Sequence, residues 1–122
     1  MGAGKTFSSA YLSQALSLPN HDTDAVIAKL CNITLPEIFN ASGEAYFREL
    51  ERKVMLGWDK PGIVATGGGC VESPEIRRML QDKKFLTIWL NPDWEVILTR
   101  ISRSDRPLVQ NRSVAELKQM WE

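Results

Sequence analysis

The chain of 122 residues is long enough for one domain of ordinary size and too short for two. Its 15 basic and 15 acidic residues balance, which argues against binding of nucleic acid through a basic surface and against a polybasic membrane anchor. The apolar runs are far shorter than the roughly 18 residues of a membrane-spanning helix. Two separated cysteines and one histidine form no zinc-binding pattern. We therefore expect a cytoplasmic protein with reduced thiols whose partner is a small molecule, with no nucleic acid or membrane as a partner.

Hydrophobic spacing predicts helices that alternate with short apolar strands. The first helix covers residues 5–17, and residues 20–24 form a short strand end or a loop. The later predicted helices cover 25–31, a segment that begins at Pro36, 43–58, 73–80 and 91–100, and the predicted strands cover 62–66 and 85–90. Strands separated by helices indicate an α/β fold with a parallel sheet and helices on its faces.

Three helix starts carry their own signals. Asp24 can cap the helix over 25–31, and Pro36 fits the first turn of the next helix. Ser73 followed by Pro74 is typical of an N-cap and a first helical position.

The amino-terminal run Gly2-Ala3-Gly4-Lys5-Thr6 has the composition of a phosphate-binding loop. Glycines allow backbone N–H groups to surround an anion, the following helix adds its positive end, the lysine reaches phosphate, and the hydroxyl suits magnesium. The complete pattern needs an earlier glycine that this sequence does not contain. A coincidental Gly-Lys-Thr is the alternative, and the helix directly behind the run favours the loop.

Asp22 and Asp24 stand on alternate residues at the end of a short strand. One carboxylate can hold magnesium through water, while the other accepts a proton or hydrogen bond from a substrate hydroxyl. The alternative is a helix N-cap with a solvated neighbour.

Arg48 and Glu51 are three residues apart on a predicted helix, so their side chains can pair, and Glu44 can share in that contact. A surface salt bridge is the ordinary interpretation. If the helix faces a cleft, Glu51 would hold the guanidinium of Arg48 ready for a substrate carboxylate.

Two further segments have polar or conformational features of a binding site. Gly67-Gly68-Gly69 follows a strand, where glycines suit either a close backbone approach to a ligand or a flexible turn. Arg100, Arg103 and Arg106 lie in a polar stretch that is either a solvated loop or a lid that closes on a phosphate.

The order of these motifs resembles the shikimate kinase family. Gly-x-Gly-Lys-Thr is followed by Asp-x-Asp, by "LPEIFNASGEAYFRELE", by three glycines and by "RPLV". The resemblance covers residues 1–109, and its most specific piece runs from Glu37 to Glu51. It implies a P-loop NTPase of the nucleoside-monophosphate-kinase-like type, acting as a monomer in aromatic amino acid biosynthesis.

The resemblance also implies a reaction and roles for individual residues. The enzyme would transfer the γ-phosphate of ATP to the 3-hydroxyl of shikimate, with Mg²⁺ as cofactor. Catalytic roles would fall to Asp24, Lys5 and Arg106. Shikimate would contact Asp24, Arg48, Glu51, Gly67, Gly68, Gly69, Phe39 and Phe47. ATP would contact Gly2, Ala3, Gly4, Lys5, Thr6, Arg100 and Arg106. Magnesium would be held by Thr6 and by Asp22.

Compared with the family, the sequence lacks the first and last strands, so it corresponds to a partial domain. Its parts would be the end of the phosphate loop over 1–6, the shikimate-binding region over 22–69 and a lid over about 100–112. The expectation is a fragment or a gene model that starts at an internal methionine, and that the 122 residues alone fold poorly and are nearly inactive. Two other functions stay open: a nucleotide-binding module without catalysis, and a kinase for a related sugar acid such as gluconate.

Overall fold

A computed structural model describes residues 2–102, 109 and 112–121 of the chain. Two compact units are present, and each is described by itself. The larger unit is Lys5–Ile88, and the smaller unit combines Met1–Gly4 with Trp89–Glu122. In the ranges that the structure describes, no helix has both the length and the apolar character needed to span a bilayer.

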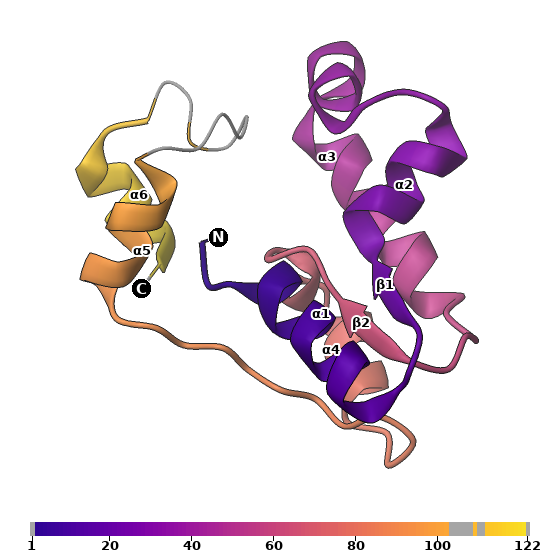
Figure 1. The fold of residues 1–122 in the computed structure, drawn as a ribbon. Coiled ribbons are helices and arrows are strands. Elements are labelled where there is room, and N and C mark those ends of the chain that lie inside the picture. The colour runs from indigo at the N-terminus through magenta and orange to yellow at the C-terminus, as the bar shows by residue number, and fades with distance from the viewer. Residues whose placement is uncertain (1, 103–108, 110–111, 122) are drawn as a thin grey trace. The chain divides into compact units, whose positions relative to one another are not determined.

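A parallel pair of strands forms the centre of the larger unit (Figure 1). Strand β1 (Asn20–Asp22) pairs with β2 (Ile63–Ala65) in the register Asn20 with Ile63 and Asp22 with Ala65. Helix α1 (Lys5–Leu16) contacts both strands. The predicted α/β class with a parallel sheet is therefore confirmed. Because parallel strands present their carboxyl ends at the same edge, the residues that follow β1 and β2 are brought together.

Two long helical segments lie between the strands in the sequence. Helix α2 (Thr23–Cys31) packs against α3 (Leu35–Leu56), as Figure 1 shows. Their shared core contains Ile27, Ile38 and Phe47, which are at most 4% exposed. The contact between α2 and α3 therefore forms one apolar core of the larger unit.

Helix α3 joins two helices that the sequence predicts separately. Gly43 interrupts it with φ 75° and ψ 176°, a backbone conformation that side chains with a Cβ rarely adopt, and the axis changes direction there (Figure 1). Its start has the expected Pro36 in the first turn and a capping box, in which the amide and the hydroxyl of Thr34 donate to Glu37 Oε2 at 2.7 and 2.6 Å. These hydrogen bonds lower the pKa of Glu37.

The chain after β2 continues through a 3-10 turn, η1 (Cys70–Glu72), into α4 (Pro74–Leu80). Ser73 caps α4 as predicted, since its hydroxyl accepts from the amide of Ile76 at 3.4 Å. A second core of Met55, Cys70 and Ile76 joins this region to the end of α3. Both cysteines are free thiols, and burial raises the pKa of Cys70.

Two sequence predictions, one of a strand and one of a helix cap, are wrong. Residues 85–90 form no strand, because no described strand lies beside them to complete a hydrogen-bonded ladder, and Leu86 stays 90% exposed. The cap of α2 is Asp22 rather than Asp24: the Asp22 carboxylate accepts from the amide of Asp24 at 2.9 Å. The helix begins two residues earlier than its apolar spacing indicated, at Thr23 rather than at residue 25, so its N-cap is also two residues earlier.

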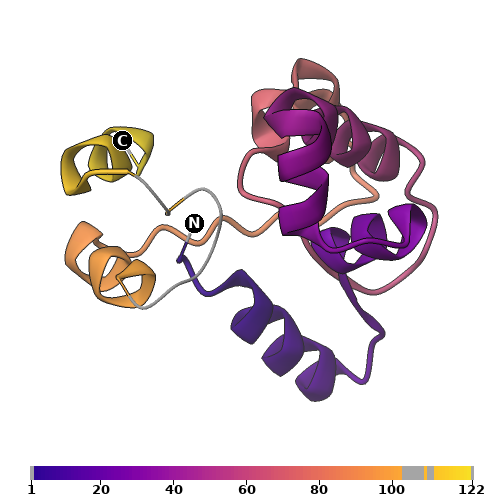
Figure 2. The ribbon, with the colours of Figure 1, turned by 90° about the horizontal axis from the view of Figure 1, so that it is seen from above.

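The smaller unit contains α5 (Trp94–Ile101) and α6 (Val114–Trp121), which lie side by side (Figure 2). Its core contains Ile97, Ile101 and Leu117. Helix α6 is absent from the predicted helices, although Ser113 and Glu116 form a capping box that could have predicted it. The amide and hydroxyl of Ser113 donate to Glu116 Oε2, each at 2.7 Å. Arg103 and Arg106 of the predicted lid lie outside the described residues.

Candidate functional site

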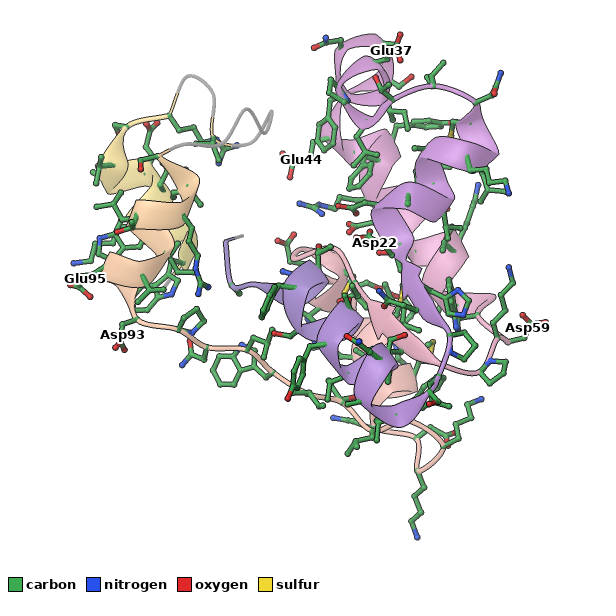
Figure 3. The ribbon with its side chains drawn as sticks, in the orientation of Figure 1. Asp22, Glu37, Glu44, Asp59, Asp93 and Glu95 are labelled. Carbon is green, nitrogen blue, oxygen red and sulfur yellow. The ribbon has the colours of Figure 1, made fainter. Side chains whose placement is uncertain are left out.

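The carboxyl ends of β1 and β2 bring together two of the predicted motifs. Asp22 closes β1 and Asp24 lies in the first turn of α2, while Gly67 follows β2 closely. Asp22 Oδ2 also accepts from the hydroxyl of Thr6, at the start of α1, at 3.5 Å. Figure 3 shows Asp22 at the end of β1, below Glu44 of α3 in that view. The site is therefore centred on the edge of the sheet.

Thr6 and Asp22 offer a hydroxyl and a carboxylate at hydrogen-bonding separation, the oxygen donors that Mg²⁺ prefers. No cluster of three or more His, Cys, Asp or Glu suited to a metal occurs among the described residues. A site with few protein ligands fits magnesium, which usually keeps several waters and binds through one or two carboxylates plus substrate phosphates. The pair is therefore chemically suited to a magnesium–nucleotide complex.

Arg48 is held between two carboxylates of its own helix. Its Nη1 donates to Glu51 Oε2 at 2.5 Å, and its Nη2 donates to Glu44 Oε1 at 3.0 Å. Glu51 is 1% exposed, whereas the side chain of Arg48 is 25% exposed and that of Glu44 is 44% exposed. Glu51 is thus a buried partner that holds the guanidinium, and Glu44 is its partner on the solvent side. The predicted pairing of Arg48 with Glu51 is therefore present, and it is more than a surface salt bridge.

Burial and charge act in opposite directions within this pair. Burial raises the pKa of Glu51, the hydrogen bond and charge of Arg48 offset the rise only in part, and the nearby Asp24 adds to it. Burial opposes the charge on Arg48, yet the hydrogen bonds and charges of Glu51 and Glu44 outweigh it, and the pKa of Arg48 is raised. A guanidinium between two carboxylates stays charged, which suits recognition of an anionic ligand.

The glycines after β2 come close to these charged groups. A Cβ on Gly67 would overlap Glu51 Oε1 and would lie 3.4 Å from Asp24 Oδ1, and a Cβ on Gly69 would overlap the guanidinium carbon of Arg48. Neither glycine has a positive φ. A Cβ at either position would therefore force the carboxylate of Glu51 or the guanidinium of Arg48 to move, which favours a close approach of the backbone over a flexible turn.

We expect Gly67→Ala to destabilise the protein by about 1–3 kcal/mol or more, because the added methyl has to displace the buried carboxylate of Glu51. Chemical denaturation would measure the change in the free energy of unfolding. Gly57→Ala is the control, since Gly57 has φ −89° at the end of α3 and the nearest atom to its Cβ is 3.3 Å away. A change at Gly67 no larger than at Gly57 would contradict the close approach.

Aromatic side chains lie beneath the arginine. The rings of Phe39 and Phe47 have centroids 4.7 Å apart, and the guanidinium carbon of Arg48 is 5.7 Å from the centroid of Phe47. Phe47 is 4% exposed and belongs to the core between α2 and α3, while Phe39 is partly buried against that core. A cavity of about 230 Å³ has Arg48, Glu51 and Gly69 among its lining residues.

The residues predicted to contact ATP fall in both units. Lys5 and Thr6 open α1 of the larger unit. In the smaller unit Gly2 and Gly4 have φ 67° and 89°, Ala3 packs against the core of α5 and α6, and Arg100 Nη1 donates to the carbonyl of Gly2 at 3.1 Å. Arg106 lies outside the described residues.

Thr23 is a buried polar residue of the site that is absent from the predicted site residues. It is 1% exposed, and its hydroxyl accepts from the amide of Gly67 at 3.0 Å. Its position between Asp22 and Asp24 at a strand end was the available signal, but only the register of the two strands reveals the contact.

Comparison with known proteins points to one family. The family model described as shikimate kinase matches residues 1–122. The shikimate kinase of Brucella canis is 40% identical over 114 residues, covering 91% of this chain and 56% of that protein. The shikimate kinase of Bartonella quintana is 37% identical over 126 residues, covering 100% of this chain and 60% of that protein. The chain thus spans little more than half the length of these relatives.

Solved structures agree with the sequence matches. The chain superposes on shikimate kinase from Acinetobacter baumannii in complex with shikimate with a TM-score of 0.88 at 30% identity, covering 99% of this chain and 69% of that one. The corresponding values for shikimate kinase from Aquifex aeolicus are a TM-score of 0.81 and 30% identity, covering 99% and 73%.

Proposed function

Because this chain belongs to the shikimate kinase family, we propose that its protein transfers the γ-phosphate of ATP to the 3-hydroxyl of shikimate, giving ADP and shikimate 3-phosphate. The observation that supports this most directly is the assembly of Asp24, the braced Arg48 and the glycines of residues 67–69 around one edge of the sheet. A flat, polyhydroxylated acid needs an arginine for its carboxylate and an aspartate for its hydroxyls.

Arg48 binds the shikimate carboxylate in this proposal. Glu51 fixes Nη1 of the guanidinium, which restricts the remaining donors to one orientation. Glu44 is exposed and bound to Nη2, so it is the partner that an incoming carboxylate displaces or joins. The ring of Phe47 lies beneath the guanidinium and contacts Phe39, and we assign apolar contacts with the acid to these two rings.

Asp24 is the general base. It accepts the proton of the 3-hydroxyl as that oxygen forms its bond to the γ-phosphorus and the bond from phosphorus to the bridging oxygen of ADP breaks. The amide of Asp24 donates to Asp22, which holds the first turn of α2 in place. The carboxylate of Asp24 is thereby kept near the backbone of Gly67.

The contacts with ATP are assigned to Gly2, Ala3, Gly4, Lys5 and Thr6 of the phosphate loop and to Arg100. Lys5 at the start of α1 carries the positive charge that neutralises the phosphates, and Arg106 supplies a second cation to the transferring group. Thr6 and Asp22 would hold Mg²⁺, which when bound neutralises charge on the phosphate oxygens. We further propose that the enzyme is a cytoplasmic monomer of aromatic amino acid biosynthesis.

Shikimate-dependent formation of ADP from Mg-ATP tests the proposal. The assay should use two forms of the protein, the 122-residue chain and the longest form that its gene encodes, with gluconate as the control acceptor. We expect turnover with shikimate and none with gluconate in the longer form. Binding of ATP without shikimate-dependent turnover in that form would overturn the proposal.

A further inference from the structure

Thr23 connects two parts of the site that are distant in the sequence. Its hydroxyl accepts from the amide of Gly67 at 3.0 Å and reaches the carbonyl of Ala65 at 3.4 Å as a donor. These contacts join the first residue of α2 to the end of β2, across 44 and 42 positions of the chain. Thr23 is only 1% exposed, so water cannot reach its hydroxyl and take the place of either hydrogen-bond partner.

The contact decides which amides of the glycine loop remain available to a ligand. The N–H of Gly67 is used by Thr23. The carbonyls of Gly67 and Gly69 accept from Cys70 and Glu72, at 3.4 and 3.0 Å, and therefore face the 3-10 turn. Among the described residues nothing accepts from the N–H groups of Gly68 and Gly69.

Thr23 also fixes the loop against the charged groups. It is the direct neighbour of Asp24. The Gly67 that it holds lies so close to Glu51 that a Cβ would overlap the carboxylate, and a Cβ there would also be in van der Waals contact with Asp24. Movement of the loop by a fraction of an ångström would therefore change the distance between the general base and the amides of Gly68 and Gly69.

We propose that Thr23 is a positioning residue for shikimate phosphorylation. Its hydroxyl holds Gly67 so that the N–H groups of Gly68 and Gly69 point at the bound acid while Asp24 faces the hydroxyl that reacts. The inference rests on the proposed function, because it assigns the acid to this loop. Thr23 acts through the loop and does not itself touch the substrate.

Steady-state kinetics of the full-length enzyme with Thr23→Val and Thr23→Ser test the inference. Valine keeps the shape and removes the hydroxyl, so the KM for shikimate should rise roughly tenfold while the KM for ATP changes less than about twofold. Serine keeps the hydroxyl and should restore a KM for shikimate within about threefold of the wild type. Thr99→Val is the control, since the hydroxyl of Thr99 donates to the carbonyl of Glu95 within its own helix α5.

The outcomes separate the positioning role from a merely structural one. Loss of folded protein lowers the apparent kcat and leaves both KM values unchanged, so a Thr23→Val enzyme with an unchanged KM for shikimate would overturn the inference. If the valine variant does not fold, Thr23→Ala, which leaves room for water beside Gly67, takes its place with the same expected shift. A wild-type enzyme without shikimate-dependent turnover would overturn the proposed function, and this inference with it.

Discussion

Replacing Asp24 with asparagine is expected to lower kcat for shikimate phosphorylation by about 10²- to 10⁴-fold, the usual contribution of a general base. Asparagine has nearly the same shape and keeps the backbone amide that donates to Asp22, so α2 should retain its cap. The KM for ATP should stay near its wild-type value, because Asp24 is assigned to the acceptor. Initial-rate kinetics with both substrates varied would measure the effect.

Asp59→Asn is a suitable control for this experiment. Asp59 is exposed in the loop before β2 and is labelled in Figure 3 away from Asp22. It should leave kcat unchanged. An Asp24→Asn enzyme within a few-fold of the wild-type kcat would show that another group accepts the proton.

Arg48→Lys is expected to raise the KM for shikimate roughly 100-fold. Lysine keeps the positive charge but loses the planar fork that contacts Glu51 and Glu44 together. Disrupting a buried, hydrogen-bonded charge pair costs about 2–5 kcal/mol, and about 3 kcal/mol corresponds to this change in affinity. Calorimetric titration with shikimate, beside the kinetics, would measure it.

Arg52→Lys provides the matched control on the same helix. Arg52 pairs with Glu49 at 2.9 Å with the same i,i+3 spacing, but both side chains are about as exposed as an ordinary surface pair, at 38% and 42%. Such pairs contribute about 0–1 kcal/mol, so neither KM should change appreciably. Equal effects of the two lysine variants would mean that Arg48 serves only the stability of α3.

Local signals predicted much of the fold. The cap at Ser73 and the first-turn position of Pro36 depend on neighbours within three residues, and helices form at both places as expected. The segment 85–90 failed because a strand depends on a partner, and its apolar residues carry no information about which described segment would pair with them. A hydrogen-bonded ladder does not follow from composition alone.

The candidate site likewise combines contacts that the local sequence predicts with contacts that depend on distant segments of the chain. The pairing of Arg48 with Glu51 follows from helical spacing and was predicted. The burial of Glu51, the overlap that excludes a Cβ at Gly67, and the contact of Thr23 all depend on the alignment of β1 with β2. The apolar spacing within each strand segment gives no information about how the two strands align.

The pairing of Asp22 with Ala65 also bears on the order of folding events, since the two partners are 43 positions apart in the chain. Helices α2 and α3, which occupy most of that interval, can form and pack through contacts closer in sequence, whereas the strands have to close a long loop. We therefore expect a folding transition state that has the helical pair and lacks the sheet. In such a state Asp24 and Gly67 are still separate, so phosphoryl-transfer competence would appear only in the final, slowest step of folding.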